Sequence, residues 1–141
     1  MQYGRIMGID YGRVRIGVAL TDLLKTIASP YEVYKSVSRK ADVEYFKKLI
    51  KEKEVELVVI GLPLNMDGTE GERVEKTRIF GEELKKEANI PVVYQDERLT
   101  SVEAENYLLS GNLRRDKRKG LIDKVSASII LEDYLNTKNC K

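Results

Sequence analysis

Asp10 is the first residue of the chain whose type and position indicate chemistry. It follows the apolar run at 6–9 and precedes the turn pair Tyr11-Gly12. A buried strand that ends in Asp and then Gly places a carboxylate at the edge of a sheet, where metals and phosphates can approach. The chain contains no His, and its one Cys is the penultimate residue, so carboxylates must carry any metal. The alternative is that Asp10 and Gly12 only build a turn.

The apolar runs that would position this carboxylate predict an α/β fold with a mixed sheet. The runs at 6–9 and 16–20 indicate a hairpin, and 27–34 a third strand that Pro30 restricts to the sheet edge. The continuous run at 57–60 is typical of a strand buried on both faces in a parallel sheet. A fifth strand is expected at 91–95, and helices from a cap at Ser38 to Glu52 and over 72–89, 100–109 and 121–136. We expect a single domain over residues 1–141.

Further acidic residues are expected to join Asp10. Open parallel sheets bind ligands beyond the carboxyl ends of their strands, where the loop at 61–71 and the pair Asp96-Glu97 also fall. Asp123 is another candidate because it shares a helical face with apolar residues, and an acid on a packing face is costly unless it is paired or metal-bound. These face-sharing residues are Ala127, Ile130, Leu131 and Tyr134. The alternative is that Asp123 only interacts with the helix dipole.

Four motifs resemble, in order and spacing, those of the YqgF (RuvX) family, relatives of the Holliday junction resolvases. They are GIDYGRVRIGVALTD, GLPLNMDGTEG, DERLTS and KGLIDKVSASIILEDYL, and they span nearly the whole chain. The resemblance implies a ribonuclease H-like mixed five-stranded sheet flanked by helices, and a nuclease that matures the 5′ end of pre-16S rRNA. It also implies a catalytic, metal-binding set of Asp10, Glu97 and Asp123, with Asp96 as the alternative to Glu97.

The implied ligand set has a chemical consequence. Three carboxylates without His or Cys suit hard cations, so we expect Mg²⁺ or Mn²⁺, which would activate a water for in-line attack on a phosphodiester. The related resolvases place an acid at the end of the strand that corresponds to 57–60, whereas Gly61 stands there in this chain. The middle acid must then come from the next strand, which argues against junction resolution more than against phosphodiester hydrolysis.

Basic and polar residues near these acids are expected to bind the nucleic-acid backbone. Five cations fall within six residues before the last predicted helix: Arg114, Arg115, Lys117, Arg118 and Lys119. Arg98 adjoins the acid pair, and Asn65 lies among glycines in the loop at 61–71. Because the formal net charge is only +2, attraction to nucleic acid must come from such local patches. The alternative is that residues 114–119 form only a solvated loop.

The sequence also bounds the setting and the competing functions. It contains no apolar run of membrane-spanning length, so we expect a cytoplasmic protein with no membrane partner. Its expected partner is RNA, above all precursor rRNA, with branched DNA as the alternative substrate and ribosomal particles as a further partner. Two other functions are a nucleotide-binding protein of the actin and sugar-kinase type, which needs a second domain around ATP, and a non-catalytic ribosome-associated module.

Overall fold

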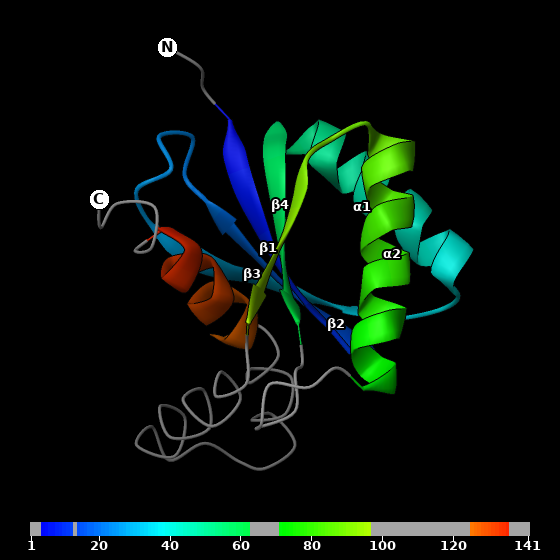
Figure 1. Cartoon of the computed structure of the whole chain (residues 1–141). Helices are drawn as coiled ribbons and strands as arrows, with labels where there is room; N and C mark the ends of the chain where they lie inside the picture. Colours follow the sequence, from blue (N-terminus) through cyan, green and yellow to red (C-terminus); the bar gives the residue numbers. More distant parts are fainter. Residues whose placement is uncertain (1–3, 13, 63–70, 97–124, 136–141) are drawn as a thin grey trace.

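The computed structural model describes residues 4–12, 14–62, 71–96 and 125–135, which form a sheet between two layers of helices (Figure 1). The elements in chain order are β1 (Arg5–Tyr11), β2 (Arg15–Thr21), β3 (Ala28–Lys35), α1 (Arg39–Glu52), β4 (Val55–Leu62), α2 (Glu72–Ala88) and β5 (Val92–Asp96). Residues 125–135 form a further helix. The predicted strands and the described parts of the predicted helices are therefore confirmed.

The five strands are hydrogen-bonded in the order β3-β2-β1-β4-β5. The pairs β1–β2 and β2–β3 are antiparallel, whereas β4 runs parallel to β1 and β5 runs parallel to β4. This is the predicted sheet of three antiparallel strands continued by two parallel ones, and β3 with Pro30 lies at its edge. The carboxyl ends of β1, β4 and β5 consequently lie together at one end of the sheet, its carboxyl edge.

The two long helices begin and end where local chemistry predicts. Ser38 caps α1, and its hydroxyl accepts a hydrogen bond from the backbone N–H of Ala41 at 3.2 Å. Helix α2 stops at Ala88, one residue before the predicted end, because Asn89 adopts the left-handed conformation with φ 51° and closes the helix. The faces expected from periodicity are buried, with Val43, Phe46, Leu49 and Ile50 in α1 and Val74, Thr77, Gly81 and Leu84 in α2.

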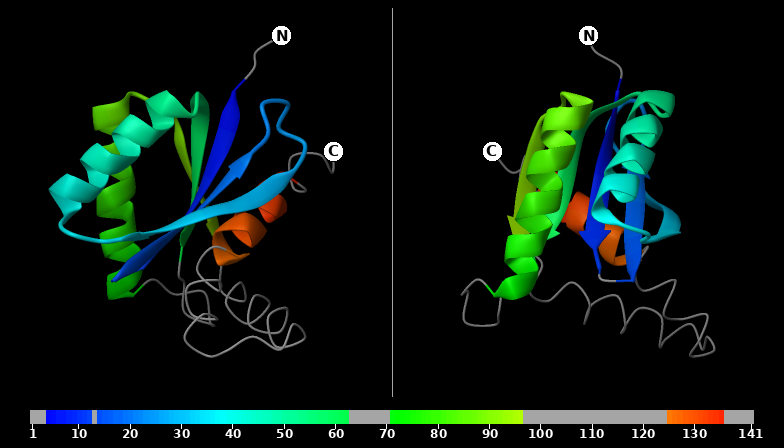
Figure 2. Two further views of the ribbon diagram at one scale, coloured as in Figure 1. Left: turned by 180° about the vertical axis from the view of Figure 1, so that it is seen from behind. Right: turned by 90° about the vertical axis from the view of Figure 1, so that its right-hand side faces the viewer.

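Each face of the sheet has its own apolar core. Met7 and Ile9 pack with α1 and α2, whereas Ile6 packs with the helix at 125–135. Figure 2 shows α1 and α2 together on one side of the sheet and the 125–135 helix on the other. The predicted packing face of that helix is buried at Ala127, Ile130 and Leu131, and Tyr134 is partly buried.

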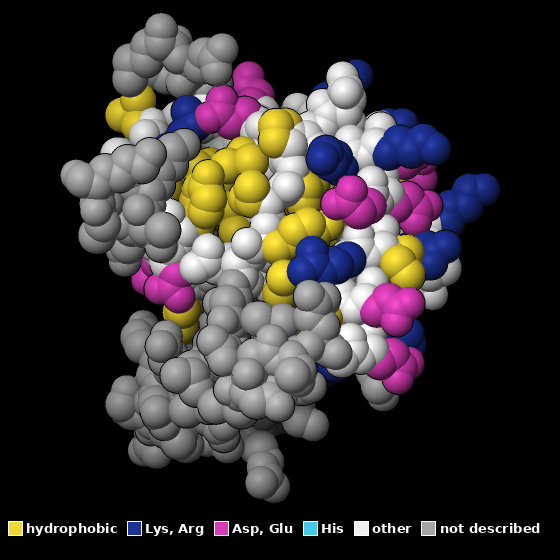
Figure 3. Space-filling view, in the orientation of Figure 1, with side chains coloured by type: hydrophobic (Ala, Val, Ile, Leu, Met, Phe, Trp, Pro, Cys, Tyr) yellow, Lys and Arg dark blue, Asp and Glu magenta, His cyan; other side chains and the backbone are white. Residues whose placement is uncertain are grey.

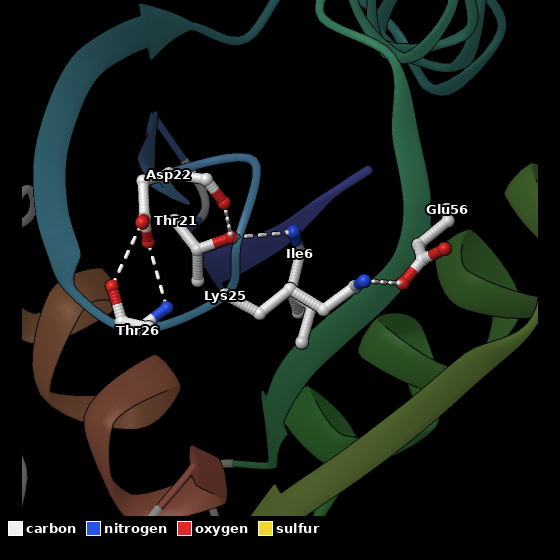
Figure 4. Close-up of polar contacts among 6 residues, drawn as sticks. All are labelled: Ile6, Thr21, Asp22, Lys25, Thr26 and Glu56. Atoms are coloured by element: carbon white, nitrogen blue, oxygen red, sulfur yellow. Dashed lines mark hydrogen bonds and ion pairs between the residues drawn. The ribbon is translucent and has the colours of Figure 1, made fainter. Parts of the chain in front are cut away.

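The connection between β2 and β3 closes the opposite edge of the sheet, away from the carboxyl ends of the parallel strands (Figure 4). The hydroxyl of Thr21, which is 2% exposed, accepts from the backbone N–H of Ile6 at 2.9 Å and donates to the Asp22 carbonyl at 2.9 Å. Lys25 then pairs with Glu56 of β4 at 2.7 Å. This turn therefore ties β1, β2 and β4 together.

Asp22 organises the same turn through its carboxylate. The carboxylate accepts hydrogen bonds from the backbone N–H groups of Thr26 and Ile27 and from the Thr26 hydroxyl. These bonds, above all the one from Ile27, favour the ionised form and lower the pKa of Asp22 to about 2. Asp22, the last residue of the motif GIDYGRVRIGVALTD, thus has a structural role.

Candidate active site

Asp10 lies at the carboxyl edge of the parallel strands, as predicted. It is the penultimate residue of β1, it is partly buried, and it pairs with Gly17 of the neighbouring antiparallel strand. On the other side of β1, Ile9 pairs with Ile60 of β4, and Leu62 at the end of β4 pairs with Asp96 at the end of β5. The backbones of Asp10 and Asp96 therefore reach the same edge, with β4 between them.

The alternation of β1 decides which face Asp10 occupies. Ile6 and Gly8 face the helix at 125–135, and Asp10 is the next position of the same parity. At Gly8 the approach is close, because a Cβ there would lie 2.8 Å from the carbonyl oxygen of Ala127 and 3.0 Å from the Cβ of Leu131. The helix backbone therefore lies directly on β1 at Gly8, two residues before Asp10 on the same face of the strand.

Gly12 is needed for the turn that follows β1. A Cβ at this position would lie 2.3 Å from the carbonyl oxygen of Arg15, a backbone atom that cannot move aside without opening the hairpin. The interpretation of Gly12 as a turn residue is therefore right. The turn also sets where β1 ends, and so where the carboxylate of Asp10 is held.

Tyr11 and α2 form the other side of the same strand end. The Tyr11 ring stacks on Phe80 of α2, with ring centroids 4.4 Å apart. Burial, and next the negative charge of Asp42, raise the pKa of the Tyr11 hydroxyl, so it stays neutral at physiological pH and is no general base. The guanidinium of Arg73 donates to the Tyr11 carbonyl at 2.9 Å. Sequence analysis missed this Arg; its position in the first turn of a helix that starts at the sheet's carboxyl edge was the available signal.

The other predicted site residues lie outside the described residues. These are Glu97 and Asp123 of the ligand set, and Asn65, Arg98, Arg114, Arg115, Lys117, Arg118 and Lys119 of the substrate-binding set. Within the described part of the chain, no group of three or more carboxylate, His or Cys side chains that could hold a metal is present. Of the set Asp10, Glu97 and Asp123, only Asp10 lies in that part, where β5 also ends in the alternative ligand Asp96. The carboxylate oxygens of Asp10 are the donor type that Mg²⁺ and Mn²⁺ prefer. The donor chemistry therefore fits the expected metals.

In the described part of the chain, no helix is both long enough and apolar enough to cross a bilayer.

Comparison with known proteins gives consistent results along the chain. A family model described as RuvX, Holliday junction resolvase, matches residues 4–137. A protein of Halothermothrix orenii named "Putative pre-16S rRNA nuclease" is 51% identical over 135 residues, which cover 96% of this chain and 96% of that protein. A protein of Clostridioides difficile with the same name is 47% identical over 135 residues, again covering 96% of both chains.

Two solved structures share the fold. RuvC of T. thermophilus in complex with a Holliday junction substrate has a TM-score of 0.57 and 16% identity over 97% of both chains. The Fowlpox virus resolvase in complex with Holliday junction DNA has a TM-score of 0.56 and 14% identity over 96% of this chain and 99% of that one. The predicted ribonuclease H-like fold is thereby confirmed.

Proposed function

Because this chain belongs to the RuvX family, we propose that it is a nuclease that hydrolyses phosphodiester bonds during maturation of the 5′ end of pre-16S rRNA. The observation that carries this proposal is the position of Asp10, a partly buried carboxylate at the carboxyl edge of the parallel strands. Relatives that match over 96% of both chains bear the name of that rRNA nuclease, which supports RNA as the substrate. The family description and the fold neighbours make a Holliday junction the second candidate substrate.

Asp10, Glu97 and Asp123 are the proposed metal ligands. For Asp123 the support is its spacing in the sequence: it stands four residues before Ala127, whose carbonyl oxygen lies against Gly8 on the face of β1 that Asp10 also occupies.

Strand parity favours Glu97 over Asp96 as the middle ligand. Val93 of β5 packs in the same core as the 125–135 helix, whereas Tyr94 packs on the face of α1 and α2. Glu97 has the parity of Val93 in the sequence, and Asp96 has the parity of Tyr94. The face of Val93 is also the face of Asp10, so Glu97 is the member of the pair that the sheet geometry supports.

Mg²⁺ or Mn²⁺ bound to these carboxylates would supply the Lewis acidity that polarises a phosphodiester and activates water. The chain's own contribution is to hold its carboxylates in place. The turn at Gly12 fixes the end of β1, and the close contact at Gly8 fixes the 125–135 helix on the same face. With no His in the sequence, imidazole takes no part in proton transfer.

The remaining substrate contacts belong to the same proposal. Asn65, Arg98 and the cations at 114–119 would hold the backbone of the nucleic acid, as the sequence predicts. With precursor rRNA as its substrate, the protein would act in the cytoplasm, on ribosomal particles or their precursors. It would act there as a single domain.

The purified full chain should be incubated with end-labelled RNA that carries the 5′ extension of 16S rRNA, and with single-stranded, duplex and four-way-junction DNA. Each reaction is run with Mg²⁺, with Mn²⁺ and with EDTA. We expect metal-dependent cleavage of the RNA, no cleavage in EDTA, and loss of cleavage in Asp10→Asn with the fold retained. Asp22→Asn, the same change at the opposite edge of the sheet, is the matched control and should cleave normally.

Three results would count against this assignment. Cleavage of the four-way junction in preference to RNA would select the second candidate. Full activity of Asp10→Asn would remove Asp10 from the ligand set. Absence of cleavage with every substrate and metal would leave a non-catalytic nucleic-acid-binding module as the function.

A further inference from the structure

A hollow of about 540 Å³ opens beside the end of β1, on the face opposite to Asp10. It is lined by Tyr11 and Gly12 at the strand end and by four residues from the first turns of α2, namely Glu72, Arg73, Lys76 and Thr77. Ligand sites in proteins commonly have volumes of roughly 300–1,000 Å³, so this hollow has room for a nucleotide-sized group. Among the described residues that line it, Arg73 and Lys76 are cations and Glu72 is an acid.

The guanidinium of Arg73 is held over the strand end by a hydrogen bond that its Nη2 donates to the carbonyl oxygen of Tyr11 at 2.9 Å. The backbone of Arg73 lies in α2, where its carbonyl accepts a hydrogen bond from the Thr77 hydroxyl at 2.7 Å. A guanidinium has five N–H donors in a rigid plane, so one bond to a carbonyl leaves donors for an anion. Because the group is already positioned, an anion that binds it loses little side-chain entropy in the process.

Lys76 supplies the second cation, and its contact with Glu72 is weak. The Nζ atom lies 3.3 Å from Oε1 of Glu72, one helical turn earlier, and the two side chains are 59% and 71% exposed. Exposed pairs with this spacing contribute little to stability. Lys76 can therefore exchange Glu72 for a stronger anion such as a phosphate, to which charge-assisted hydrogen bonds are shorter and stronger.

The surface around α2 mixes charges of both signs. In Figure 3, Lys and Arg side chains alternate with Asp and Glu side chains over the α2 side of the visible face. The attraction to an anion at the hollow is therefore a local property of Arg73 and Lys76. A nucleic-acid backbone that follows such a surface would be bound only where its phosphates meet cations such as these two.

The position of the hollow relative to Asp10 suggests its ligand. Tyr11 follows Asp10 directly, and alternation directs the two side chains to opposite faces of β1. A polynucleotide that crosses the edge of the sheet passes both residues. We propose that Arg73 and Lys76 bind a backbone phosphate of the substrate strand next to the one that is cleaved, a proposal that rests on the nuclease function above.

The test measures binding of a labelled 12-nucleotide single-stranded RNA to the full chain in EDTA, by fluorescence anisotropy at several salt concentrations. The double variant Arg73→Gln/Lys76→Gln is compared with Lys85→Gln/Lys86→Gln, which removes the same charge from the other end of α2. We expect the first variant alone to lose about tenfold in affinity, because charge-assisted bonds to phosphate are lost. Its slope of log affinity against log salt should fall by about 0.7, the contribution of one phosphate on a single strand.

Two additions keep the outcome decisive. Lys76→Gln alone should lose affinity without a change in melting temperature, because the exposed pair with Glu72 that it removes contributes little to stability, whereas Arg73→Gln also removes the bond to Tyr11. Equal affinity and slope in the two double variants would overturn the phosphate site even if the wild-type protein cleaves RNA. A selective loss in the first variant, together with no cleavage by the wild type, would keep the phosphate site and reject the nuclease function.

Discussion

The contact between Gly8 and the 125–135 helix allows a sharp test of how the site is held together. Gly8→Ala adds one methyl group at a point where the nearest atoms are the carbonyl oxygen of Ala127 at 2.8 Å and the Cβ of Leu131 at 3.0 Å. Both belong to the helix framework and cannot rotate away. The helix must therefore move off β1 as a body, or the strand must bend.

The expected magnitude follows from two opposing effects. Overpacking of a close contact costs typically about 1–3 kcal/mol. Replacing a strand Gly by Ala recovers roughly 0.5–1 kcal/mol, because the unfolded chain loses conformational freedom. At the midpoints of these ranges the net loss in the free energy of unfolding is about 1 kcal/mol, which corresponds to a fall in melting temperature of roughly 3–5 °C for a domain of this size.

Thermal and urea unfolding measure this loss, and Gly4→Ala is the matched control. The three atoms nearest to a Cβ at Gly4 all belong to the Glu56 side chain, at 3.1 Å, and this side chain can shift more easily than a helix backbone, so we expect a change within about 0.5 kcal/mol. Cleavage is measured well below the melting temperature. On the proposed ligand set, Gly8→Ala should lose more than about tenfold in rate while still folded, because small misplacements of catalytic groups are costly. If the two variants unfold and cleave alike, the helix does not pack on β1 as described.

Three further outcomes are expected. The pKa of Asp22 is about 2 in the folded state and near 4 in the unfolded chain, so its ionised form stabilises the native state. In urea unfolding, the wild type should exceed Asp22→Asn in free energy of unfolding by a constant amount above about pH 4. This difference should shrink between about pH 4 and pH 2. Alanine at Arg114, Arg115 and Lys117 together should weaken binding to all RNA sequences alike and leave the melting temperature nearly unchanged. The slope of log affinity against log salt should fall by about two to three. An unchanged slope would make the 114–119 segment a solvated connection. Within the acid pair, Glu97→Gln should abolish metal-dependent cleavage and Asp96→Asn should retain it, a result that the reverse pattern would contradict.

The fold could be predicted because local signals and burial agree along the chain. The uninterrupted run at 57–60 predicted a strand buried on both faces in a parallel sheet, and Val58, Val59 and Ile60 are buried in β4, which runs parallel to both β1 and β5. Pro30 cannot donate a backbone hydrogen bond, so it predicted the edge position of β3. The end of α2 was misplaced by one residue because Asn89 fits both a helix end and the left-handed cap that follows it.

The site was less predictable, because it depends on contacts between distant segments. Asp10 could be selected from the sequence, since an acid after a buried run has few structural uses. The role of Gly8 could not, because a glycine in a strand indicates close approach without naming the partner, which is a helix more than 110 residues later. Arg73 was missed for the same reason, since its partner is the carbonyl of Tyr11, 62 residues away.

The position of Gly61 explains why the middle carboxylate of the proposed site should be a Glu. Since Ile9 pairs with Ile60, Gly61 continues β4 beside Asp10 and offers no side chain there, so we propose that the middle acid follows the next strand, β5. Neighbouring strands are about 4.8 Å apart, which puts the backbones of β1 and β5 roughly 10 Å from each other. A carboxylate that follows β5 must cover more of that gap than one from β4, and Glu is longer than Asp by one methylene. Reach and strand parity therefore both favour Glu97 as the proposed ligand, and the two arguments are independent because one concerns distance and the other direction.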